Sequence, residues 1–134
     1  MIVLDASAAV ELVLQTPRAE RIVARALRPE ESLHAPCLID IEVVQAMRRL
    51  VQAKEITATR ADEALSDFED WVIQRHEHRP LVRRVWGLRT SLSAYDAAYV
   101  ALAEALAAPM LTCDAKLARA HRCEAKIERV RNDP

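Results

Sequence analysis

Short apolar runs separated by helical patterns are the feature that most constrains the fold of this chain. Apolar runs bounded by turn residues predict buried strands, and apolar residues at helical spacing predict helices. Strands are expected at Ile2–Leu4, Leu33–Ala35, Met110–Thr112 and Lys126–Val130, with a weakly marked one at Val72–Gln74. Apolar strands that alternate with helices are typical of parallel sheets covered on both faces. With right-handed crossovers, the chain should form a three-layer α/β/α domain.

Seven helical segments connect the predicted strands. They are Ser7–Leu14, a stretch that begins near Pro17, Leu38–Val51, a stretch capped by Thr57 or Thr59, Leu81–Leu88, a stretch from Tyr95 that is stopped by Pro109, and Ala115–His121. The clearest apolar stripe belongs to the fourth of these. Its members are Ala61, Ala64, Leu65, Phe68, Trp71 and Val72.

Composition indicates a globular, cytoplasmic protein. The 134 residues, 51% of them hydrophobic, suffice for one domain over residues 1–134 with its own core. No apolar run approaches the roughly 18 residues of a membrane helix, and the N-terminus lacks the basic region and apolar core of a signal peptide. Three cysteines without paired spacing fit a reducing compartment. The net charge of −1 does not indicate a general nucleic-acid coat.

Glycine is nearly absent, since Gly87 is the only one. Glycine-rich dinucleotide loops and P-loops need several glycines for close approach of the backbone to phosphate. Both kinds of loop are therefore excluded. If this chain acts on phosphate, a metal ion has to hold it.

Four acids occur where the pattern predicts apolar or structural residues: Asp5, Glu42, Asp96 and Asp114, called the acidic quartet below. Asp5 and Asp114 each follow a predicted strand, so both should face the edge where ligands bind to open parallel sheets. Glu42 lies on the apolar face of its helix, and Asp96 lies near the start of its own. Both helices can aim an acid at the same edge.

Carboxylates gathered at one edge would repel one another. At ~4 Å and an effective dielectric constant of ~20, each like-charged pair costs about 4 kcal/mol. Either some carboxyls are protonated or a cation binds among them. Oxygen ligands select hard ions, so Mg²⁺ or Mn²⁺ is the expected cofactor. Such an ion can activate water and neutralise an oxyanion, which suits phosphodiester hydrolysis.

Each acid also has a structural alternative. Asp5 and Asp114 could cap the helices that follow them, and Asp96 could favour the positive end of its helix. Glu42 could form a buried salt bridge with Arg48 or Arg49. Asp40 is interpreted as an ordinary helix-start acid. The joint pattern favours a site more strongly than any single acid does.

Other polar residues are weaker candidates. Ser7 and Thr112 lie two residues from Asp5 and Asp114, and they could orient a carboxylate or act only as capping or core hydroxyls. The basic side chains that could contact substrate phosphate, or form a solvated surface instead, are Arg75, Arg79, Arg83, Lys116 and Arg119. Cys113, His121 and Cys123 match no closed zinc site.

The chain resembles the PIN-domain family, and within it the VapC-type toxins of bacterial toxin–antitoxin pairs. The resemblance covers essentially the whole chain. It is carried by the opening IVLDASA, by the helix around Glu42, and most specifically by SAYDAAYVALAEALAAPMLTCDAKLARA. There, an acid opens an Ala-rich helix, a proline ends it, and a strand leads to Thr112-x-Asp114.

The resemblance implies a central, mostly parallel sheet of four or five strands and an endoribonuclease that depends on Mg²⁺ or Mn²⁺. The acidic quartet matches the family's metal-binding acids, and Ser7 and Thr112 match hydroxyl positions beside them. The family further implies an RNA substrate, a homodimer, and a VapB-type antitoxin whose C-terminal segment blocks the site. Some relatives carry another acid where this chain has Ala115, Lys116 and Leu117, so the number of metal ions stays open.

Two rival functions remain at this stage. Asp5 could be the nucleophile of a phosphatase similar to the haloacid dehalogenases, but those enzymes carry a second Asp where this chain has Ser7. Alternatively, the chain could be a PIN scaffold that binds without turning over substrate. The intact acidic quartet argues against this second reading.

Overall fold

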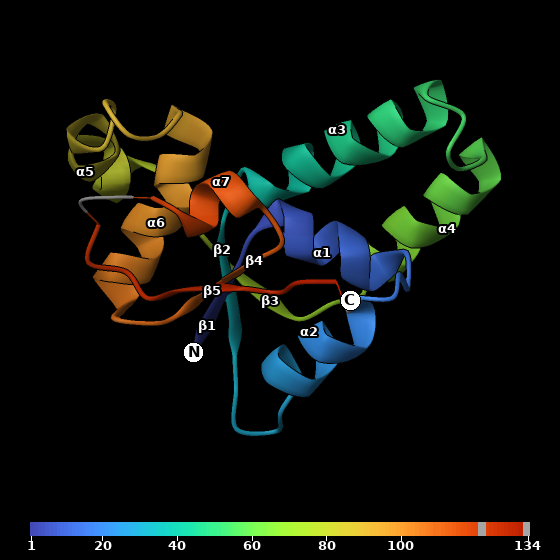
Figure 1. The fold of residues 1–134 in the computed structure, drawn as a ribbon, viewed down its shortest axis with the longest axis horizontal. Coiled ribbons are helices and arrows are strands. Elements are labelled where there is room, and N and C mark those ends of the chain that lie inside the picture. Colours follow the sequence, from blue (N-terminus) through green and yellow to red (C-terminus); the bar gives the residue numbers. More distant parts are fainter. Residues whose placement is uncertain (121–122, 133–134) are drawn as a thin grey trace.

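A five-stranded parallel sheet organises the computed structural model, which describes residues 1–120 and 123–132 (Figure 1). The strands are β1 (Ile2–Leu4), β2 (Leu33–Pro36), β3 (Ile73–His76), β4 (Met110–Thr112) and β5 (Ile127–Arg129). Their order is β3-β2-β1-β4-β5, and every neighbouring pair is parallel. The predicted α/β/α fold is confirmed.

In the part of the chain that the structure describes, seven α-helices and one 3₁₀ turn connect the strands. They are α1 (Ala6–Val13), α2 (Ala19–Ala26), α3 (Ile39–Gln52), α4 (Ala58–Glu69), the 3₁₀ turn Arg79–Leu81, α5 (Val82–Gly87), α6 (Ala94–Leu106) and α7 (Ala115–Ala118). Helices α5 and α6 lie on one side of the sheet, and α1 and α2 lie on the other (Figure 1). Helices α3 and α4 form an antiparallel pair that projects beyond the carboxyl ends of the strands.

The predicted boundaries need two corrections. Trp71 and Val72 do not extend the stripe of α4, because that helix ends at Glu69 and Val72 is 88% exposed. Trp71 instead packs edge-on against Phe68 after the chain has turned. The Leu81–Leu88 helix is preceded by a 3₁₀ turn that Pro80 helps to start. The predicted end of the last short helix at His121 lies outside the described residues.

The core is densest around β1 and α6, the two elements nearest the predicted site. Ile2, Val3 and Leu4 are fully buried between β2 and β4, and α6 buries every side chain from Ala97 to Ala103. Small alanines allow α6 to approach the sheet closely, and Tyr99 is the largest fully buried side chain in the described residues. This packing fixes Asp5 and Asp96, which directly precede or follow the buried segments. In residues 1–120 and 123–132, no helix has the length and apolar character needed to cross a membrane.

Candidate active site

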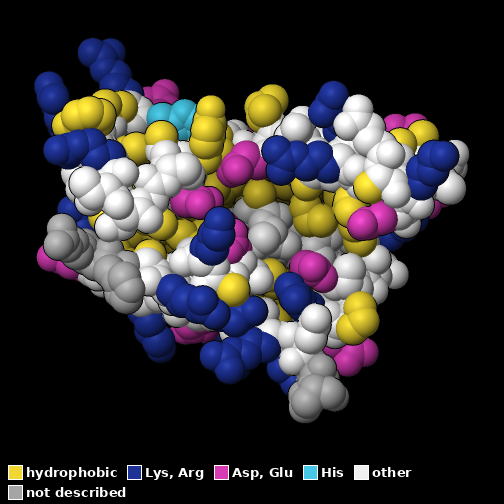
Figure 2. Space-filling model, turned by 45° about the horizontal axis from the view of Figure 1, so that its top comes forward, with side chains coloured by type: hydrophobic (Ala, Val, Ile, Leu, Met, Phe, Trp, Pro, Cys, Tyr) yellow, Lys and Arg dark blue, Asp and Glu magenta, His cyan; other side chains and the backbone are white. Residues whose placement is uncertain are grey.

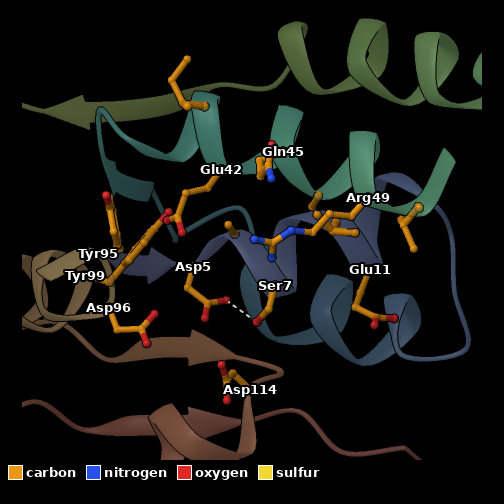
Figure 3. A pocket seen from close by; sticks show the side chains of 15 residues that line it. Asp5, Ser7, Glu11, Glu42, Gln45, Arg49, Tyr95, Asp96, Tyr99 and Asp114 are labelled. Atoms are coloured by element: carbon orange, nitrogen blue, oxygen red, sulfur yellow. Dashed lines mark hydrogen bonds between the residues drawn. The ribbon is translucent and has the colours of Figure 1, made fainter. Parts of the chain in front are cut away.

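A cavity of about 750 Å³ opens at the carboxyl ends of β1 and β4, and the whole acidic quartet lines it. Figure 2 shows acidic side chains around a hollow on this face of the molecule, with Lys and Arg side chains nearby. The other polar side chains that line it are Ser7, Glu11, Gln45, Arg49, Tyr95 and Tyr99 (Figure 3). The structure therefore brings together the four acids that sequence patterning selected.

Asp5 is held rigidly at the end of β1. Its Oδ1 accepts hydrogen bonds from the Ser7 hydroxyl at 2.7 Å and from the Ala8 backbone N–H at 3.0 Å, while Oδ2 accepts from the Thr112 hydroxyl at 2.6 Å. Asp5 thus caps α1 and also lines the cavity, so its structural and site roles coexist. Burial raises the pKa of Asp5 to about 6, against the effect of these hydrogen bonds and with a contribution from Asp114.

Ser7 and Thr112 join the two central strands through their side chains. The Ser7 hydroxyl accepts a 2.9 Å hydrogen bond from the Cys113 backbone N–H, and the Thr112 hydroxyl accepts one of 3.0 Å from the backbone N–H of Asp114. The two hydroxyl oxygens are 3.3 Å apart. Both predicted hydroxyl residues therefore fix the positions of Asp5 and Asp114, which directly follow β1 and lie just after β4.

Asp96 and Asp114 reach the cavity from two different helices, α6 and α7. Asp114 caps α7 by accepting from the backbone N–H groups of Lys116 and Leu117 at 2.7 and 3.3 Å. Asp96 lies in the first turn of α6, where Ser93 is the N-cap residue and accepts from the Asp96 backbone N–H. Burial raises the pKa of Asp96, and the charge of Asp114 adds to that effect. The two carboxylates are therefore electrostatically coupled across the cavity.

Glu42 points from α3 toward the other acids rather than toward a basic partner (Figure 3). Within residues 1–120 and 123–132, no ion pair links it to Arg48 or Arg49, so the predicted alternative of a buried salt bridge is wrong. Its Oε1 is buried without a hydrogen-bond partner, as is the hydroxyl oxygen of Tyr99 beside it. The two groups interact electrostatically, but they do not meet the geometry of a hydrogen bond. Burial raises the pKa of Glu42, and repulsion from Asp96 raises it further.

These features fit a hard divalent cation. Three partly or fully buried carboxyls with raised pKa values share one cavity, and an unpartnered carboxylate oxygen faces it. Oxygen-only donors of this kind suit Mg²⁺ or Mn²⁺. In the described part of the chain, no three acidic, histidine or cysteine side chains are close enough to enclose an ion directly. An ion here would be held partly through water, as Mg²⁺ commonly is.

The basic residues proposed from sequence lie outside the cavity lining. Arg75 on β3 forms a salt bridge with Asp40, with the closest N–O distance at 2.7 Å, so Asp40 has a structural partner. Arg79 and Arg83 lie on exposed positions of the 3₁₀ turn and α5. Lys116 and Arg119 are exposed at α7, and the charge of Lys116 lowers the pKa of Asp96. Of the five, Lys116 is electrostatically linked to the acidic quartet.

Five polar residues that line the cavity were not predicted as site residues from the sequence. For four of them, the spacing from a predicted site residue already indicates a shared helical face. Gln45 and Arg49 follow Glu42 by three and seven residues, and Glu11 follows Ser7 by four. These intervals place them on the same helical faces as predicted site residues. Tyr99 follows Asp96 by three residues in the same way. Tyr95 directly precedes Asp96 and has no such relationship.

Comparison with known proteins identifies the family. The PIN domain family model matches residues 2–122. The chain is 45% identical over 130 residues to Ribonuclease VapC12 of Mycobacterium tuberculosis, which covers 97% of this chain and 99% of that protein.

Solved structures share the fold at low sequence identity. VapBC2 from Rickettsia felis, bound to a DNA fragment from its promoter, superposes with a TM-score of 0.69 at 14% identity, covering 96% of this chain and 98% of that one. VapC20 of Mycobacterium tuberculosis, described as a toxin that cleaves the sarcin–ricin loop, gives 0.66 at 16% identity, covering 94% and 99%. The chain therefore belongs to the PIN domain family, and within it to the VapC ribonucleases.

Proposed function

We propose that this protein is a metal-dependent endoribonuclease, the toxin of a toxin–antitoxin pair, and that the acidic quartet is its catalytic centre. The observation that carries the proposal is the convergence of Asp5, Glu42, Asp96 and Asp114 on one cavity at the carboxyl ends of β1 and β4. Full-length similarity to VapC12, named a ribonuclease, supports RNA as the substrate class. We further infer that the protein acts in the cytoplasm.

The residues have distinct roles in the proposed reaction. Asp5, Asp96 and Asp114 would hold Mg²⁺ or Mn²⁺ directly or through water, and Glu42 would either ligate the ion or accept a proton from water. Glu42 suits proton transfer because burial raises the pKa of its carboxyl group. When bound, the ion would supply an activated water and offset charge on the leaving 3′ oxygen. Ser7 and Thr112 keep Asp5 oriented throughout.

The residue two positions after Asp5 argues against the rival phosphatase chemistry. Phosphatases similar to the haloacid dehalogenases carry a second Asp there, whereas this chain has Ser7, which donates a hydrogen bond to Asp5 Oδ1. Ser7 and Thr112 together orient the Asp5 carboxylate, as hydrogen-bonding neighbours of a metal ligand do.

A neighbouring antitoxin and a second copy of the chain are the proposed partners. The fold neighbour VapBC2 contains an antitoxin, which supports a VapB-type partner for this chain. We infer that the C-terminal segment of the antitoxin blocks the cavity and that the toxin forms a homodimer. Co-purification with the product of the adjacent gene, followed by light scattering of the isolated toxin, tests both statements.

Cleavage of RNA by the purified, antitoxin-free protein tests the proposed activity. Wild-type protein should cleave total bacterial RNA with Mg²⁺ or Mn²⁺, and EDTA should stop it. Asp96→Asn should abolish both cleavage and growth arrest while circular dichroism shows an unchanged fold. Asp62→Asn, an exposed acid on α4, is the matched control and should cleave normally. Undiminished, EDTA-sensitive cleavage by Asp96→Asn would contradict the proposal. Undiminished cleavage that EDTA does not stop would indicate a contaminating nuclease.

A further inference from the structure

Two exposed side chains lie on either side of part of the acidic quartet. Figure 3 shows Tyr95 of α6 on one side of Glu42 and Asp5, and the guanidinium of Arg49 of α3 on the other. Tyr95 is 67% exposed although it lines the cavity, and Arg49 is also exposed. Both residues are therefore accessible to a molecule that enters the cavity.

Arg49 directs a free guanidinium into the cavity. Its side chain extends from α3 toward Glu42 and over the region of Ser7 (Figure 3). Among the described residues, no hydrogen bond or ion pair holds Arg49, whereas Arg75 and Arg25 form close salt bridges with Asp40 and Glu128. The nearby Glu11 is bound to Thr16 and Arg18 and points away. A guanidinium in this position is suited to bind a phosphate through two parallel hydrogen bonds.

Tyr95 presents an aromatic ring beside a highly charged cavity. Its position in the first turn of α6 fixes the backbone next to Asp96, while the ring itself is exposed at the cavity. Exposed rings at nucleic-acid sites stack on unpaired bases, because the faces of a base within a duplex are covered by its neighbours. The ring therefore suits an unpaired base better than a paired one.

We propose that Arg49 and Tyr95 hold the RNA strand across the acidic quartet. The Arg49 guanidinium binds a phosphate that flanks the one to be cleaved, and the Tyr95 ring stacks on an unpaired base on the other side. Because Glu42 and Asp5 lie between the two residues in Figure 3, a strand that contacts both would pass over the proposed catalytic centre. This inference rests on the proposed ribonuclease function, and it restricts cleavage to sites with at least one unpaired base.

Kinetics and binding on one RNA test the assignment of Arg49. The substrate is a labelled oligonucleotide that carries a site mapped from cleaved total RNA. Arg49→Gln should raise KM roughly tenfold and change kcat less than about twofold. The lost contact to a flanking phosphate is equally strong in the ground state and the transition state, so only binding is weakened. Fluorescence anisotropy in an Asp114→Asn background should show a salt dependence of binding that is shallower by about 0.7, as expected for one lost phosphate contact with single-stranded RNA. Arg48→Gln, the exposed neighbour outside the cavity lining, is the control and should match the wild type.

A different signature is expected at Tyr95. Tyr95→Leu should weaken binding of the unpaired oligonucleotide roughly tenfold with an unchanged salt slope, and Tyr95→Phe should restore binding because the ring is retained. Binding of a fully paired RNA should be unaffected by either change. If Arg49→Gln behaves like Arg48→Gln, or Tyr95→Leu binds like the wild type, the inference is overturned while the ribonuclease proposal survives. If the wild type cleaves no RNA, the ribonuclease proposal fails, and anisotropy with an unpaired oligonucleotide of arbitrary sequence still decides whether these residues bind RNA.

Discussion

The Thr112 hydroxyl donates a 2.6 Å hydrogen bond to Asp5 Oδ2, and this bond links the carboxyl ends of β4 and β1 inside the core. Thr112 is fully buried, so its hydroxyl exchanges no contact with solvent. The same oxygen accepts the backbone N–H of Asp114. One buried hydroxyl therefore orients two members of the acidic quartet.

Thr112→Val should weaken the site without disturbing its shape. Valine matches threonine in volume but cannot donate, so Asp5 loses a hydrogen bond that lowers its pKa and the Asp114 backbone N–H loses its acceptor. We expect a loss of about 1–3 kcal/mol in the free energy of unfolding at pH 7. RNA cleavage should fall, and its acidic limb should move to higher pH. Urea unfolding and a pH–rate profile measure both effects, and Thr112→Ser should restore them. A Val variant as stable and active as the wild type would contradict this role.

Asp5→Asn should stabilise the metal-free protein at neutral pH. The pKa of Asp5 is raised from 3.8 to about 6 on folding, so the folded state binds the proton more tightly. The resulting stability is fully present below pH 3.8 and is lost as pH rises through about 6, which amounts to about 3 kcal/mol. Asparagine cannot ionise, so its advantage should grow between pH 4 and 7. Urea unfolding in EDTA across this range measures it; an advantage that shrinks with rising pH would refute the assignment.

Tyr99→Phe should leave the metal-free protein at least as stable as the wild type. The Tyr99 hydroxyl is buried without a hydrogen-bond partner, and such a group costs about 1–3 kcal/mol. Phenylalanine keeps the ring that fills the core and removes only that oxygen. Chemical denaturation checks the prediction. A loss of more than about 1 kcal/mol would mean that the hydroxyl forms a strong hydrogen bond after all, with Glu42 as the nearest candidate.

Divalent cations should stabilise the folded protein by mass action. An ion that binds the folded state at a concentration of 100 times its Kd adds about 2.7 kcal/mol. Mn²⁺ or Mg²⁺ should therefore raise the Tm of the wild type, with a smaller rise for Asp96→Asn and reversal by EDTA. Differential scanning fluorimetry at constant ionic strength separates specific binding from screening. Equal shifts for wild type and variant would place the ion elsewhere.

Ala107→Gly should stabilise the fold at a position remote from chemistry. Ala107 ends α6 in the left-handed conformation, with φ of 49°, which side chains with a Cβ rarely adopt. We expect a gain of about 0.5–1 kcal/mol in the free energy of unfolding. Ala105→Gly, on an exposed position within the same helix, should instead lose a similar amount. Thermal unfolding of the two variants checks that one glycine stabilises the protein and the other destabilises it. Lost side-chain contacts alone would make both substitutions destabilising.

The sequence reveals local elements better than long-range partners. Apolar runs predicted the strands, helical spacing predicted the helices, and acids at apolar positions predicted the four carboxylates. All three patterns can be recognised from residues that are close together in the sequence. The hydrogen bond from Thr112 to Asp5 joins residues 107 positions apart, and it depends on β1 pairing with β4. Periodicity carries no information about that register. The sequence likewise did not predict that Arg75 pairs with Asp40, since this contact joins β3 to the first turn of α3.

Exposure was the second property that residue patterns did not predict. Helical spacing placed Tyr95 at the start of a helix, but it did not predict that the ring is 67% exposed at the cavity. Arg49 was one of two arginines considered as an alternative partner for Glu42, but both side chains line the cavity, and the described residues include no ion pair between them. Whether a helical side chain faces the core or a hollow depends on what packs against it, and that is a property of the assembled layers.

The order of the strands also determines when the enzyme can first act during its own synthesis. Strand β1 lies at the centre of the sheet, but its partner β4 is made only after β2 and β3. A nascent chain that ends before Met110 has Asp5, Glu42 and Asp96 but neither Thr112 nor Asp114. The complete acidic quartet therefore cannot assemble until β4 has been made and has paired with β1. The proposed activity then depends on a strand pairing that joins two distant parts of the chain, and not on the presence of the first three acids alone.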